Sequence, residues 1–148
     1  MNLKSCLDKR LVKRVSKDNE LIKSLSESSF AKYKAMKMIK IGDNTGPAKI
    51  SLMYDAAREY MEAIVLNNGF KVYNHECYCA VFCEALNESP LADEFDEYRK
   101  LRNDINYYGR KISKDEAMKV IKNMKDFLTK LKLKFRMLQK TTKNIYIT

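Results

Sequence analysis

The segment from Ser113 to Leu138 carries the pattern that most constrains the fold of this chain. It opens with Ser-Lys-Asp-Glu, a capping box in which a serine and a glutamate satisfy free amides at a helix N-terminus. Apolar residues then follow at alternating steps of four and three: Ala117, Ile121, Met124, Leu128, Leu131, Phe135 and Leu138. This spacing predicts a long helix that packs along its whole length.

Helix-breaking residues are scarce in the rest of the chain, since its 148 residues include four glycines and two prolines. Helical spacing and capping signals predict five further helical segments: residues 3–15, 16–41, 48–67 and 75–86, and one that starts at Ser89 and contains residues 101–110. We therefore predict one all-α domain spanning residues 1–148. Its core is expected at about 17–138, and the tail 139–148 receives no assignment.

Charge is distributed unevenly along the chain, which carries a net charge of +10. Residues 1–49 hold 12 basic and 5 acidic side chains, residues 50–109 hold 5 and 11, and residues 110–148 hold 12 and 3. Basic ends suit a polyanion such as RNA, because lysine and arginine displace the counterions of phosphates. Solvated helix surfaces would give the same pattern, so both interpretations stay open.

The cysteines and the single histidine allow two interpretations. Cys77, Cys79 and Cys83 are too crowded for a disulfide framework, so we expect all four cysteines, Cys6 included, to be reduced. His75, Cys79 and Cys83 follow at steps of four, which permits a zinc site, but the interleaved apolar residues favour core packing. We therefore expect no metal and no cofactor, and we expect His75 to be a surface or capping residue.

No apolar run approaches the length of a membrane span, and the N-terminus lacks the apolar core of a signal peptide. We therefore expect a cytoplasmic protein with no membrane association.

Arg102 occupies an unusual position in the helix that begins at Ser89. On a helical wheel it projects inside an apolar stripe made by Leu91, Phe95, Tyr98, Leu101, Ile105 and Tyr108. Arginine keeps its charge, so Arg102 must pair with Glu94 or Asp55, snorkel, or face a cleft or an interface. Asn106, four residues further on, is its expected neighbour, and Tyr108 is expected to pack between helices.

The stretch YRKLRNDINYYGR, which contains Arg102, resembles the signature region of the HEPN superfamily, all-α domains linked to nucleotide and RNA biology. YDAAREYMEAIVLNNGFKVYNHECYCAVF is similar to the middle of small archaeal HEPN proteins, and the resemblance covers about residues 17–132. It implies an up-and-down bundle of four to five helices that forms a homodimer, with the arginine motif at the subunit interface.

In the nuclease members of that superfamily, the arginine is followed after four to six residues by a histidine, and together they cleave RNA without a metal. Arg102 and Asn103 match this motif, but Tyr107 stands where a histidine is expected, and tyrosine is a poor base at neutral pH. Because residues 102 and 107 point about 140° apart on a regular helix, joint action is expected to need a second copy or a distorted turn.

We therefore expect a binding function without efficient catalysis. The resemblance implies a pocket at the dimer interface, formed by Arg102, Asn103, Asn106 and Tyr107, that binds RNA or a nucleotide. Two alternatives remain. One is a toxin-like, metal-independent ribonuclease in which Arg102 and Tyr107 are catalytic, and the other is a partner or scaffold for a small nucleotidyltransferase in a toxin–antitoxin-like pair.

Overall fold

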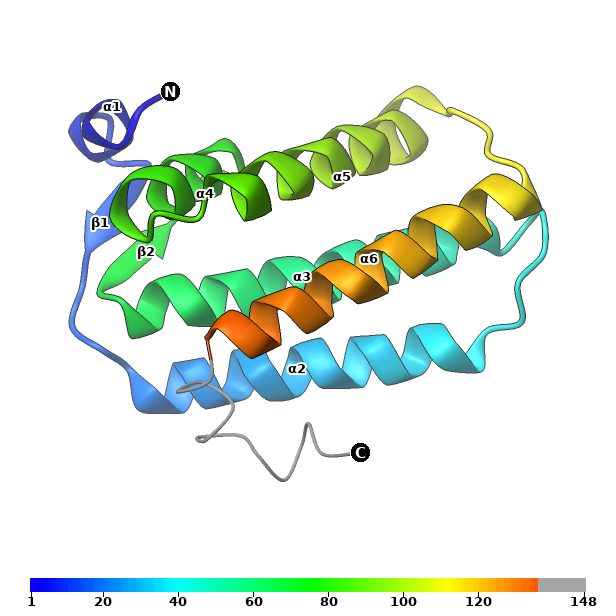
Figure 1. Cartoon of the computed structure of the whole chain (residues 1–148), viewed down its shortest axis with the longest axis horizontal. Coiled ribbons are helices and arrows are strands. Elements are labelled where there is room, and N and C mark those ends of the chain that lie inside the picture. Colours follow the sequence, from blue (N-terminus) through cyan, green and yellow to red (C-terminus); the bar gives the residue numbers. More distant parts are fainter. Residues whose placement is uncertain (136–148) are drawn as a thin grey trace.

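The computed structural model describes residues 1–135 of the chain and is dominated by helices (Figure 1). Along the chain the elements are α1 (Leu3–Asp8), β1 (Val12–Arg14), α2 (Asn19–Met38), α3 (Gly46–Asn67), β2 (Phe70–Val72), α4 (Glu76–Ala80), the π-helical turn η1 (Val81–Ala85), α5 (Ser89–Tyr108) and α6 (Lys114–Lys134). The expected all-α class is confirmed.

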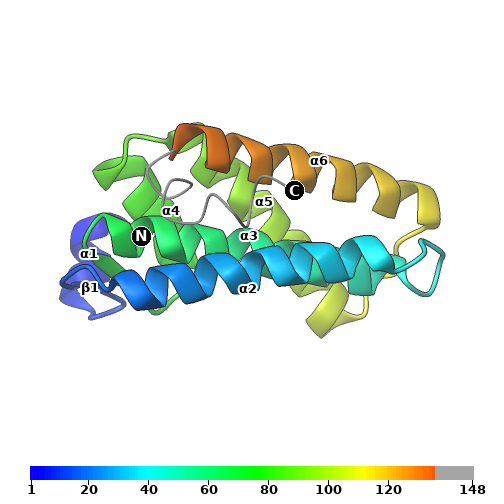
Figure 2. The same cartoon turned by 90° about the horizontal axis from the view of Figure 1, so that it is seen from below.

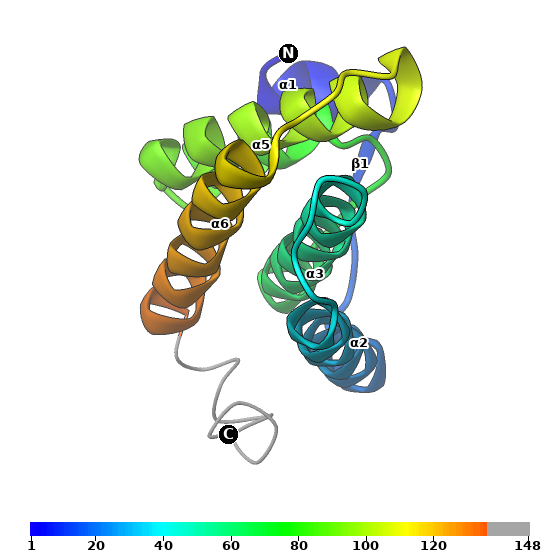
Figure 3. The same cartoon turned by 90° about the vertical axis from the view of Figure 1, so that its right-hand side faces the viewer.

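Four long helices form an up-and-down bundle. Followed by colour in Figure 1, α2 and α5 run in one direction while α3 and α6 return in the other. Figure 2 shows α2 alongside α3 over most of its length, and Figure 3 shows α5 and α2 on opposite sides of the molecule, with α3 between them. The predicted bundle architecture is therefore present, with the short helices α1 and α4 added at one end.

Helix α3 is the central element of the core. Its buried residues extend from Gly46 to Leu66 and cover most of its circumference, as expected for a helix that is surrounded by others. Tyr54 on α3 stacks on Phe95 of α5 with ring centroids 5.3 Å apart, and Phe95 in turn stacks on Phe127 of α6 at 6.3 Å. These aromatic contacts join three of the long helices.

Local signals located several helix ends correctly. The Ser113 side chain accepts a hydrogen bond from the Glu116 amide at the start of α6, and Gly69 adopts a φ of 88° just after α3. Helix α2 begins later than predicted, because the side chain of Asp18 accepts from the Leu21 amide and caps the helix there. Leu138 and the tail 139–148 lie outside the described residues.

The predicted helix over residues 3–15 is wrong in its second half. Helix α1 ends at Asp8, Arg10 takes a positive φ of 59°, and Val12–Arg14 form strand β1. Strand β1 pairs antiparallel with β2, with Val12 opposite Val72. The partner strand lies far away in the sequence, so the pairing that stabilises β1 leaves no local periodic signal.

The prediction of four reduced cysteines is also wrong. Cys6 of α1 and Cys77 of α4 form a disulfide, with their Cα atoms 6.2 Å apart, and both are fully buried. Cys79 and Cys83 are free thiols. The crowding of three cysteines argued against a framework of several bridges, but it does not prevent one of them from pairing with a distant partner.

Within residues 1–135, no helix is long and apolar enough to cross a membrane.

Candidate functional site

Arg102 lies where α5 faces α3, and its guanidinium is enclosed by two tyrosines. Its Cζ atom is 4.4 Å from the ring centroid of Tyr54 and 5.9 Å from that of Tyr107. Nη1 donates to the Tyr107 hydroxyl at 3.3 Å, whereas Nε is buried and has no hydrogen-bond partner among residues 1–135. A buried donor without a partner is costly, and such atoms are concentrated where function or strain requires them.

No carboxylate neutralises Arg102 in the part of the chain that the structure describes. The expected alternatives, Glu94 and Asp55, do not form an ion pair with it. Glu94 instead accepts from the Tyr98 hydroxyl at 2.5 Å and from Lys130 at 3.3 Å. Among the described residues, the guanidinium is instead stabilised by its cation–π contact with Tyr54 and by its hydrogen bond to the Tyr107 hydroxyl.

The only histidine of the chain belongs to the same group of residues. His75 is the N-cap residue of α4, yet its side chain does not cap the helix. Its Nδ1 lies 2.9 Å from the hydroxyl of Tyr54, within hydrogen-bonding distance. Tyr54 thus contacts the histidine through its hydroxyl and Arg102 through its ring, which places His75 and Arg102 on two sides of one buried tyrosine.

Positive charge surrounds this histidine. Burial lowers the pKa of His75 below its ordinary value, and the positive charges of Arg58, Arg102 and Arg99 lower it further, opposed by Asp55. The imidazole is therefore neutral at pH 7, with one ring nitrogen able to accept a proton. Burial also raises the pKa of the Tyr54 hydroxyl, although Arg102 opposes that rise, so this tyrosine stays protonated.

The two other arginines of the group differ from Arg102 because carboxylates hold them. Nη1 of Arg58 is 3.0 Å from Glu62, and Nε of Arg99 is 2.9 Å from Asp96. Arg102 is consequently the member of the group whose charge lacks an acidic partner among residues 1–135. A negatively charged ligand could therefore accept hydrogen bonds from the guanidinium of Arg102.

The residues expected around Arg102 are brought together only in part. Tyr107 contacts it directly within one chain, so a second copy is not required for that contact. Asn106 is directed elsewhere, since the Ser51 hydroxyl donates to its Oδ1 at 3.0 Å. The half-buried Asn103 forms no side-chain hydrogen bond with any residue in the described range. Tyr107, rather than Asn106, is the neighbour of Arg102.

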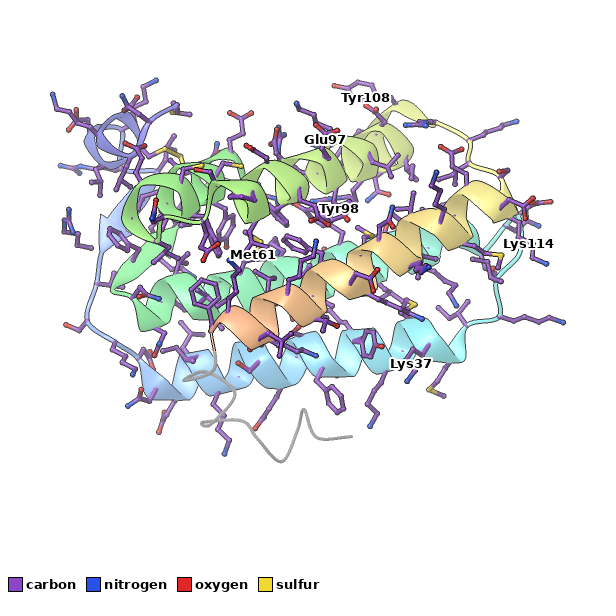
Figure 4. All side chains as sticks on the ribbon, in the orientation of Figure 1. Lys37, Met61, Glu97, Tyr98, Tyr108 and Lys114 are labelled. Atoms are coloured by element: carbon purple, nitrogen blue, oxygen red, sulfur yellow. A yellow bond between two sulfur atoms is a disulfide. The ribbon has the colours of Figure 1, made fainter. Side chains whose placement is uncertain are left out.

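Tyr107 and Tyr108 project from the last turn of α5. Their exposed fractions are 69% and 82%, and Figure 4 shows Tyr108 pointing away from the bundle. The expectation that Tyr108 packs between helices is therefore wrong. The apolar stripe weakens toward the end of α5, because Leu101 and Ile105 are only half-buried and Gly109 terminates the helix with a φ of 66°.

The cysteines near His75 do not form a metal site. In the described residues, no group of three histidine, cysteine or acidic side chains is arranged to hold a metal ion. Cys77 is in the disulfide, and the Cys79 thiol lies 3.3 Å from the carbonyl oxygen of Ala92. Burial raises the pKa of Cys79 to about 11, so it is an unreactive thiol at neutral pH.

Sequence reasoning missed His75 and Tyr54 as members of this site. Both come from elements that precede α5, and their relation to Arg102 depends on how α3, α4 and α5 pack. One signal was present in the sequence, namely a lone histidine at the start of a helix within a strongly patterned region. Spacing alone could not show which side chain it would face.

Comparisons with protein-family models, with curated proteins and with solved structures found no match for this chain.

Proposed function

We propose that this protein binds RNA or a nucleotide through a phosphate group at Arg102. The observation that carries the proposal is a half-buried guanidinium with an unsatisfied Nε and no acidic partner in residues 1–135. Arginine matches phosphate geometry with parallel hydrogen bonds, and its bonds to anions are about twice as strong as neutral ones. A phosphate that drew the guanidinium outward would satisfy the donor that is now unpaired.

The surroundings of Arg102 support an anionic ligand with an aromatic base. The positive charges of Arg58 and Arg99 also reach the region beside Arg102, because all three arginines lower the pKa of His75. The exposed rings of Tyr107 and Tyr108 offer faces on which unpaired bases can stack. These rings also supply apolar area for a homodimer contact at the end of α5, so the proposal includes a dimer with the pocket at its interface.

The binding proposal is tested with Arg102→Ala, with Arg110→Ala as the matched control. Arg110 lies two residues after the end of α5, is exposed and pairs with Glu116 at 2.8 Å. We expect Arg102→Ala to weaken binding of an oligoribonucleotide or nucleotide by about 1 to 3 kcal/mol, the range for hydrogen bonds to charged groups. Helical content should not change. Equal losses in both variants would contradict a specific role for Arg102.

His75 favours ribonuclease activity as a second candidate function. The motif that Tyr107 leaves incomplete lacks a base, and His75 is a neutral imidazole linked to Arg102 through Tyr54. With its proton on Nδ1, the free Nε2 could accept the proton of a ribose 2′-hydroxyl while Arg102 stabilises the phosphate charge. This candidate needs no contribution from Tyr107 as a base.

A cleavage assay in EDTA separates the two candidates. The binding-only proposal expects slow cleavage or none, and expects that Tyr107→His creates activity if its imidazole reaches the bound phosphate. Robust wild-type cleavage that is lost in both Arg102→Ala and His75→Gln would establish the second candidate instead. Tyr54→Phe should then reduce the rate less than His75→Gln, because it removes only the hydroxyl that orients the imidazole.

A further inference from the structure

Two adjoining hollows lie along the side of α6 that faces α2, away from the Arg102 site. The first has a volume of about 190 Å³ and includes Phe30, Tyr33 and Lys37 of α2 and Lys125 and Lys132 of α6 in its lining. The second, of about 230 Å³, is lined by Ile41, Lys49, Met118, Ile121, Lys122 and Lys125. Lys125 lines both hollows, and we call the two together the lysine groove.

The described lining of the lysine groove is rich in lysine. It includes Lys37, Lys49, Lys122, Lys125 and Lys132, and no aspartate or glutamate among residues 1–135 lines either hollow. Lys37 and Lys125 form no ion pair with any residue in the range 1–135. This arrangement differs from the other face of α6, where Lys130 and Lys134 are paired with Glu94 and Glu88.

Several of these ammonium groups have lost part of their hydration. The Nζ atoms of Lys37 and Lys132 lie 5.4 and 5.6 Å from the ring centroid of Tyr33, so both cations rest on one aromatic side chain. Burial lowers the pKa of Lys132 to about 8. Burial and the charge of Lys125 lower the pKa of Lys49, which donates to the Ile39 carbonyl. An anion in the groove would stabilise these crowded charges.

We infer that the lysine groove binds the phosphate backbone of a single-stranded polynucleotide. Lys122 and Lys132 are ten positions apart on α6, which corresponds to roughly 15 Å along the helix axis. Such a row of cations exceeds the size of one phosphate and matches a chain of them. Lysine is suited to this role because it acts as a point charge and needs no fixed geometry, so it binds backbone without reading sequence.

This inference rests on the proposed function and makes it more specific, because it selects a polynucleotide over a free nucleotide as the partner. Figure 3 shows that α2, on one edge of the groove, lies across the molecule from α5, which carries Arg102. Figure 4 likewise labels Lys37 on α2 and Tyr108 at the end of α5 on opposite sides. Two separate phosphate contacts suit a polymer that extends over the surface of the bundle.

The test compares two variants that each lose two charges. Lys37→Gln/Lys125→Gln removes two groove lysines that form no ion pair among residues 1–135, and Lys4→Gln/Lys119→Gln removes two exposed lysines that line neither hollow. Lys132 stays intact because it is partly buried. Binding of a single-stranded oligouridylate and of uridine monophosphate is measured over a series of salt concentrations, and circular dichroism checks that both variants fold.

We expect the groove variant to bind the oligouridylate roughly tenfold more weakly at low salt. Its slope of log affinity against log salt should fall by about 1.4, since each phosphate contact on a single strand contributes about 0.7. The control should retain the wild-type slope, and uridine monophosphate should bind both variants equally. Loss of monophosphate binding in the groove variant alone would show a free-phosphate site instead and overturn the inference.

The remaining outcomes distinguish this inference from the proposed function. If the groove variant and its control bind the oligouridylate equally while Arg102→Ala loses binding, the groove is not a backbone site and the proposed function stands. If the wild type binds only the monophosphate, the inference fails and the nucleotide form of the proposed function remains. If the wild type binds neither probe, both fail.

Discussion

Removing the disulfide between Cys6 and Cys77 should destabilise the protein more than any change to its free thiols. The bridge spans a sequence separation of 71 residues, and the loop-entropy relation for a loop of that length gives about 4.4 kcal/mol. Residual structure in the reduced unfolded chain decreases this value, so we expect roughly 2 to 4 kcal/mol for Cys6→Ala/Cys77→Ala. That is a large share of the stability of a typical domain.

Urea unfolding followed by circular dichroism measures the effect, with Cys79→Ala/Cys83→Ala as the matched control. The control removes two thiols that form no disulfide and should keep its sensitivity to reductant. Adding reductant should lower the unfolding midpoint of the wild type and of this control, and should leave Cys6→Ala/Cys77→Ala unchanged. Thiol titration of the denatured, unreduced wild type should find two free thiols. Four free thiols, or a loss below about 1 kcal/mol, would refute the reasoning.

Three further predictions concern packing, pH and assembly. Gly46→Ala should destabilise the protein by about 1 to 3 kcal/mol in urea unfolding, because the added Cβ would meet Ala117 Cβ at 2.8 Å, whereas Gly42→Ala meets only an ordinary contact and should be nearly neutral. Because the folded-state pKa of His75 lies below 6.5, its contribution to stability is complete above that pH and is lost as the pH falls toward the folded-state pKa. The urea midpoint should fall over that range, and His75→Gln should lose this component. Sedimentation should show a dimer at micromolar concentration, and a monomer would contradict the proposed assembly.

The sequence sufficed for those parts of the fold that depend on local signals. The Ser113 capping interaction, the left-handed Gly69 and the apolar spacing of α6 are short-range features, and the structure has all of them. Strand β1 and the bridge between Cys6 and Cys77 are different, because each depends on a partner far along the chain. No periodicity within a window of residues encodes such a pairing, so helix was expected where a strand formed.

The site shows the same division between local and distant information. The helical wheel of α5 places Arg102 in an apolar stripe, and the half-buried position of its side chain agrees with this placement. It also suggested that Tyr107 points away from Arg102, but wheel directions describe Cβ atoms. Arginine and tyrosine are long enough to curve toward each other, and the 3.3 Å contact forms near the end of α5. The contact between His75 and Tyr54 could be learned only from the packing of α4 on α3.

The position of His75 connects the disulfide to the site. Helix α4 has five residues and passes directly into the π-helical turn, so it is too short to be stable by itself. Two interactions hold its start: the Asn74 side chain accepts from the Glu76 amide at 2.8 Å, and Cys77 is bonded to Cys6 of α1. Since Cys77 lies two residues after His75, the tether that fixes the N-terminal segment also fixes the imidazole against Tyr54. Arg102 is held by the much longer α5 and does not share this dependence. The two sides of the site are therefore held in place differently: Arg102 is positioned by the helical bundle, and His75 is positioned by a disulfide.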